Sequence, residues 1–140
     1  MPVAMVATLL AIALMAWDHL WGNQRGSEDS FPVDAGTFFL SLGLIAVAAV
    51  VVFGVTVPRS ITNPDGIHRA AVIHGVVAVV LAIPASWLGL PVIVAGGAIA
   101  LGVRALDGPH RRIAIAAIAL GALVMAFGIL STAFPPVEND

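Results

Sequence analysis

Cysteine is absent from this 140-residue sequence, and so are lysine and tyrosine. Without cysteine the chain has no disulfide, thiolate zinc site, cysteine-ligated iron–sulfur cluster or thiol redox chemistry. Charge is also scarce, because 10% of the residues are charged, against roughly 25% in a typical soluble domain. The six basic residues are all arginine and form no basic tract, which argues against nucleic acid as a partner.

Apolar residues make up most of the sequence. They make up 60% of the chain, and the mean hydropathy is +1.05. A chain of this length allows one domain, and with so few polar residues its surface must be covered by lipid. The composition therefore predicts an integral membrane protein with one transmembrane domain over residues 1–140.

The apolar runs predict an all-α, polytopic bundle of five spanning helices. A spanning helix needs about 20 mostly apolar residues to cross a core about 30 Å thick. The stretch 70–106 is too long for one crossing, and Pro84, Gly89 and Pro91 predict a break in it. A four-helix arrangement without that break is the alternative. The expected helices cover residues 3–20, 35–57, 68–86, 90–106 and 112–134.

The placement of charge predicts a cytoplasmic N-terminus and an external C-terminus. Cytoplasmic loops carry excess arginine, and with this topology the loops 58–69 and 104–112 hold five of the six arginines. The opposite side receives most of the acids and all three tryptophans, which prefer membrane interfaces. The first helix lacks a basic start and a small-residue cleavage site, so we expect it to be retained rather than removed as a signal peptide.

One short motif occurs twice. Asp65-Gly66-Ile67-His68-Arg69 returns 42 residues later as Asp107-Gly108-Pro109-His110-Arg111, each time before an apolar helix. The repeat suggests two hairpins, 35–86 and 90–134, related by an axis along the membrane normal. The simplest interpretation is a turn that opens a helix. A functional interpretation is a basic ring that contacts lipid head groups or an acidic partner: His68, Arg69, Arg104, His110, Arg111 and Arg112.

His74 is the candidate buried polar site. It lies about 9 Å deeper than His68 on a helix and shares its face with small residues that mark close helix packing. A structural role would pair it with Thr56 or with a helix carbonyl. The alternatives are a proton relay, a substrate gate or a haem or quinone ligand. A second histidine at matching depth is missing, so we expect neither haem nor another cofactor, and no segment has metal-site spacing.

No nucleophile stands beside a base, and we expect no enzymatic activity. The favoured hypothesis is a small accessory or assembly subunit of a larger membrane complex, or a self-associating bundle. A small transporter or channel with His74 on the pathway is the alternative. The expected partners are the lipid bilayer, other membrane subunits or further copies. The composition suggests the cell membrane of a GC-rich bacterium.

Overall fold

The computed structural model describes residues 2–21, 35–63, 65–83 and 89–133, and the regular structure in these ranges is entirely helical. The π-helix η2 continues α2 directly into α3, so the seven segments form five helical rods. The predicted count of five helices is therefore confirmed. The elements are α1 Pro2–Trp21, α2 Ala35–Ala49, η2 Val50–Thr56, α3 Val57–Ile61, α4 Ile67–Leu81, α5 Leu90–Ala105 and α6 Arg111–Ala133.

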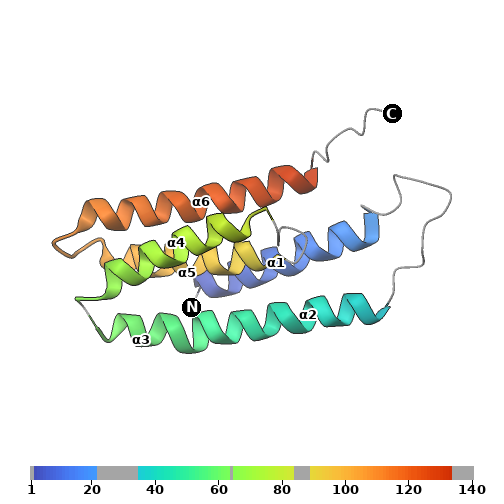
Figure 1. Cartoon of the computed structure of the whole chain (residues 1–140), viewed down its shortest axis with the longest axis horizontal. Coiled ribbons are helices and arrows are strands. Elements are labelled where there is room, and N and C mark those ends of the chain that lie inside the picture. The colour runs from blue at the N-terminus through green and yellow to red at the C-terminus, as the bar shows by residue number, and fades with distance from the viewer. Residues whose placement is uncertain (1, 22–34, 64, 84–88, 134–140) are drawn as a thin grey trace.

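The rods lie side by side and alternate in direction along the chain (Figure 1). The turn between α3 and α4 and the turn between α5 and α6 lie at the same end of the bundle, at the left of Figure 1. We call this the arginine end, because Arg59, Arg69, Arg104, Arg111 and Arg112 belong to the helices that meet there. The last turns of α1 and α6 lie toward the opposite end.

The helix expected over 35–57 continues to Ile61, past Pro58. Pro58 has no backbone N–H to donate, and it lies inside the continuous rod, just after the π-helix η2. The preceding π-helix also shifts the hydrogen-bond ladder, since the N–H of Val57 donates to the carbonyl of Val52.

The long apolar stretch 70–106 is broken as predicted. α4 ends at Leu81 and α5 begins at Leu90, although the expected end of the third helix at residue 86 lies outside the described residues. Gly89 adopts the left-handed conformation with φ of 67° just before α5. Glycine takes this conformation at little cost, and it redirects the chain into α5. The stretch 70–106 therefore contains two helices rather than one.

α5 is the central helix of the bundle. Ten of its sixteen residues are buried, and it packs along α4, α6 and α1. Much of the core consists of alanine and glycine, including the fully buried Ala71 and Ala78 on α4 and Ala117 on α6. Small residues let helix backbones approach closely, so the fold is held by close helix contacts more than by large side chains.

The outside of the bundle is apolar. Large hydrophobic side chains are exposed on every rod, among them Leu9, Phe39, Val47, Val80 and Leu123. Two helices, Phe38–Ile61 and Arg111–Ser131, are long and apolar enough to cross a membrane. Only 17% and 22% of their most apolar stretches are buried in the bundle, so these stretches face mainly outward.

Candidate functional site

His74 lies on α4, and its imidazole bonds to its own helix. Nδ1 donates to the carbonyl oxygen of Ala70 over 2.8 Å. A carbonyl oxygen can only accept, so Nδ1 carries a proton, and Nε2 is the ring's acceptor when the imidazole is neutral. The helix carbonyl, one of the two partners considered from the sequence, is thus the partner found.

The His74 ring lies against the central helix. A Cβ built on Gly97 of α5 would lie 2.9 Å from Cδ2 of His74 and 2.7 Å from Cγ1 of Val52. Real Cβ atoms do not approach that closely. Because Gly97 has no side chain, there is space for the side chains of both His74 and Val52. His74 is half-buried at this three-helix contact, between α4, η2 and α5.

Thr56, the other candidate partner, uses its hydroxyl within its own rod. Its Oγ1 donates to the carbonyl of Val51, five residues earlier, over 3.0 Å. That carbonyl belongs to η2, where the wider turns change the normal pairing of the backbone. The structure therefore does not join Thr56 to His74 by a hydrogen bond.

The π-helix was not foreseen from the sequence. It spans seven residues, Val50–Thr56, and brings Val52 against Gly97 and the ring of Phe53 within 3.1 Å of a Cβ built on Gly96. π-Helical turns are rare and often occur at functional sites. Its residues are ordinary apolar ones, so no local signal distinguishes this segment from an α-helix.

The two histidines of the repeated motif meet at the arginine end. The rings of His68 and His110 have centroids 4.7 Å apart and planes inclined by 77°. His110 is exposed, whereas Nδ1 of His68 is buried and has no hydrogen-bond partner. The sequence placed both histidines at one end of the bundle but did not predict this contact, although the 42-residue spacing was the signal for it.

The side chains of the arginines at this end are exposed. No ion pair is formed among the described residues, although Asp65 and Asp107 belong to the same turns. Arg69 follows His68 and Arg111 follows His110, so each ring of the histidine pair has a guanidinium on the next residue. The six basic candidates from the sequence therefore belong to the helix ends and turns of the arginine end, and the rings of two of them touch.

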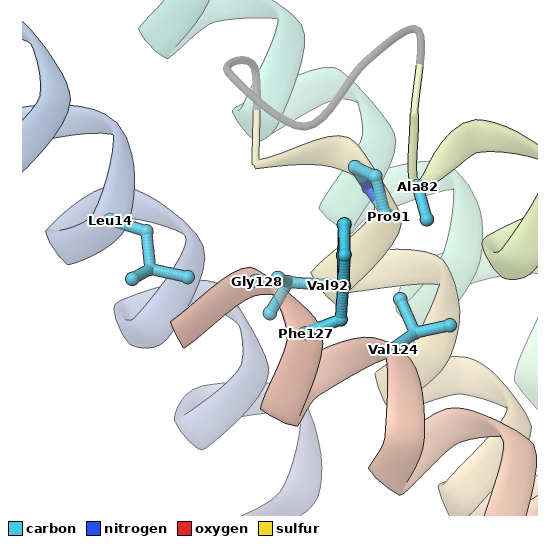
Figure 2. Close-up of a pocket in the computed structure, with 7 residues that line it drawn as sticks. All are labelled: Leu14, Ala82, Pro91, Val92, Val124, Phe127 and Gly128. Carbon is cyan, nitrogen blue, oxygen red and sulfur yellow. The ribbon is translucent and has the colours of Figure 1, made fainter. Parts of the chain in front are cut away.

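The opposite end of the bundle holds a small apolar cleft with a volume of about 10 Å³. Its walls come from the ends of several helices, including Leu14 of α1, Val92 of α5 and Phe127 of α6 (Figure 2). Among the described residues, those that line the cleft are all apolar. The acidic segment between α1 and α2 lies outside the described residues.

Within the described ranges, no group of three or more histidine, aspartate or glutamate side chains gathers as a metal centre. No protein-family model, curated protein or solved structure matches this chain. The candidate site consequently rests on three local features. These are the His74 contact with Gly97, the π-helix beside it and the histidine pair among unpaired arginines.

Proposed function

We propose that this chain is a multi-spanning membrane protein that acts through its helix faces, as an accessory subunit of a membrane complex or as a self-associating bundle. The apolar exterior carries the proposal. Side chains such as Phe39, Val47 and Leu123 are each more than 60% exposed, and water is a poor solvent for such a surface. Lipid or the apolar face of another membrane helix suits it.

The proposed topology has all five helices crossing the bilayer, with the arginine end in the cytoplasm. The clustering of five exposed arginines at one end supports it, because such residues stay on the cytoplasmic side. α4 and α5 have 15 and 16 residues, shorter than the usual span. A bilayer accommodates shorter helices by thinning and by snorkelling of the flanking side chains.

A role without catalysis is supported by how the bundle is packed. The central helix α5 packs against its neighbours largely through alanine and glycine. The described residues that line the cleft at the far end are all apolar. The features that remain for function are the outer helix faces and the arginine end. The cell membrane of a bacterium is the proposed location, and the composition, rich in alanine, valine and glycine and without lysine, supports it.

Purification from native membranes in mild detergent tests this role. We expect the chain to elute in a complex, either with other membrane subunits or with further copies of itself. Cross-linking in the intact membrane before solubilisation is the control against dissociation by detergent. A chain that remains a monomer after cross-linking, without co-purifying subunits, would contradict the proposal.

A small transporter is the second candidate, and the π-helix beside His74 favours it. π-Helical turns occur often at functional sites, and His74 is a polar group at a contact of three helices. Ion and solute flux into proteoliposomes should then fall when His74 is replaced by alanine. Gly43→Ala is the control, because nothing lies within 4 Å of a Cβ at Gly43. Equal flux in His74→Ala and the native protein would remove His74 from any pathway.

A further inference from the structure

The contact between His68 and His110 requires an explanation beyond packing. Nδ1 of His68 is buried without a partner, whereas nearly all buried polar atoms in proteins have one. A second imidazole lies beside the ring, at a centroid distance of 4.7 Å. Neutral imidazole is the commonest metal ligand in proteins, and two imidazoles this close can share one ion.

We propose that His68 and His110 form a two-histidine site for a divalent transition metal ion that prefers imidazole, such as Zn²⁺, Ni²⁺ or Cu²⁺. Metal–nitrogen distances of about 2.0–2.1 Å put the centroids of two imidazoles on one ion about 5 Å apart. The separation found is close to that value. Water or a group from a partner completes the coordination.

Backbone hydrogen bonds order the chain on which the two histidines stand. In the turn before α4, the N–H of Gly66 donates to the carbonyl of Asn63. The carbonyl of His110 accepts from the N–H groups of Ile113 and Ala114 and so opens α6. The His110 side chain is exposed and can rotate to present a nitrogen to the ion, whereas His68 is partly buried. An ion held by both rings would tie the start of α4 to the start of α6.

The charged groups of this end determine how added salt changes the affinity for the metal ion. An imidazole ligand is neutral, so the arginines repel a cation without competing for its coordination sites, and added salt screens this repulsion. Binding should therefore tighten as ionic strength rises, the reverse of a site built from carboxylates. The charged residues of the elements that meet here are Arg59, Asp65, Arg69, Arg104, Asp107, Arg111 and Arg112.

The four histidines of the chain allow a complete set of controls. Each is replaced singly by glutamine in the full-length protein, purified in detergent with any polyhistidine tag removed. Zinc binding is followed by titration calorimetry and by the rise in Tm, and Cu²⁺ binding by the nitrogen splittings in its electron paramagnetic resonance spectrum. Mg²⁺, which prefers oxygen ligands, is the control ion.

We expect one Zn²⁺ per chain, a Cu²⁺ spectrum with two imidazole nitrogens and no effect of Mg²⁺. His68→Gln and His110→Gln should each weaken binding at least tenfold, whereas His19→Gln and His74→Gln should leave it unchanged. His110→Gln carries the test if His68→Gln does not fold, because His110 is exposed. Native-like binding by His110→Gln, or no Zn²⁺ binding by the native chain, would overturn the proposal. Neither result depends on whether the bundle acts alone or as a subunit.

Discussion

The imidazole of His74 and the backbone of Gly97 share one contact, where a Cβ at Gly97 would come within 2.9 Å of Cδ2 of His74. Cγ1 of Val52, in the π-helix, would lie 2.7 Å from the same Cβ. Three helices thus meet at a residue that must be glycine. This contact joins the polar side chain of His74 to the π-helical segment of the second rod.

We predict that Gly97→Ala destabilises the bundle. Overpacking a filled core costs about 1–3 kcal/mol, because Val52 and His74 would both have to shift. Gly43→Ala is the matched control and should be neutral or stabilising, because its Cβ meets nothing within 4 Å and alanine favours helix. Thermal unfolding in detergent, followed by circular dichroism, measures both. Equal Tm values for the two variants would show that the contact at Gly97 is not tight.

Truncating His74 should relieve part of that strain. In a double-mutant cycle, Gly97→Ala should cost less in a His74→Ala background than in the native chain, because the added methyl enters space that the imidazole has left. We expect a coupling energy of about 0.5–3 kcal/mol, the range found for residues in contact. Strict additivity of the two Tm effects would contradict the geometry.

Gly89→Ala should also destabilise the bundle. Gly89 has φ of 67°, and its Cβ would lie 2.9 Å from the carbonyl oxygen of Ala11. The left-handed conformation costs a residue with a side chain about 1–2 kcal/mol, and the clash with the backbone of α1 adds to it. Gly66→Ala is the control, because Gly66 also precedes a helix but has φ of −100° and meets only Asn63. A smaller loss of Tm for Gly89→Ala than for Gly66→Ala would contradict this account.

Ser41→Ala should be neutral or stabilising. Ser41 is fully buried on α2, and its Oγ has no hydrogen-bond partner. An unsatisfied buried polar group costs about 1–3 kcal/mol, which alanine removes. In Ser60→Ala, by contrast, the hydroxyl bond to the carbonyl of Thr56 is lost. Tm measurements on the two variants should rank Ser41→Ala above Ser60→Ala, and the opposite ranking would show that Ser41 has a partner.

A substitution on the outer helix surface can test whether that surface faces lipid or water. Val47 is 62% exposed near the middle of the second rod. Val47→Arg should reduce membrane insertion, since arginine at the centre of a spanning helix costs about 2.5–3.5 kcal/mol. Ile61→Arg, at the arginine end, should insert normally. In water an exposed substitution changes stability by no more than about 0.5 kcal/mol, so a folded, soluble Val47→Arg protein would contradict a lipid-facing surface.

The helices were predictable because their breaks carry strong local signals. Pro84, Gly89 and Pro91 predict the break before α5, and the charged turns separate the other rods. The π-helix could not be predicted, since seven apolar residues suit an α-helix equally well. The ring contact of His68 with His110 depends on how α4 crosses α6. That crossing arises from alanine and glycine contacts spread along both helices, which no single motif encodes.

The central claim is that the arginine end lies in the cytoplasm and that the far end of α6 lies outside. Because the chain has no cysteine, single cysteines can report each side without background labelling. Asn63 is exposed in the turn before α4, and Ser131 is exposed near the end of α6. In intact cells, a membrane-impermeant maleimide should label Ser131→Cys, and Asn63→Cys only after the membrane is opened. Labelling of Asn63→Cys in intact cells would contradict the account.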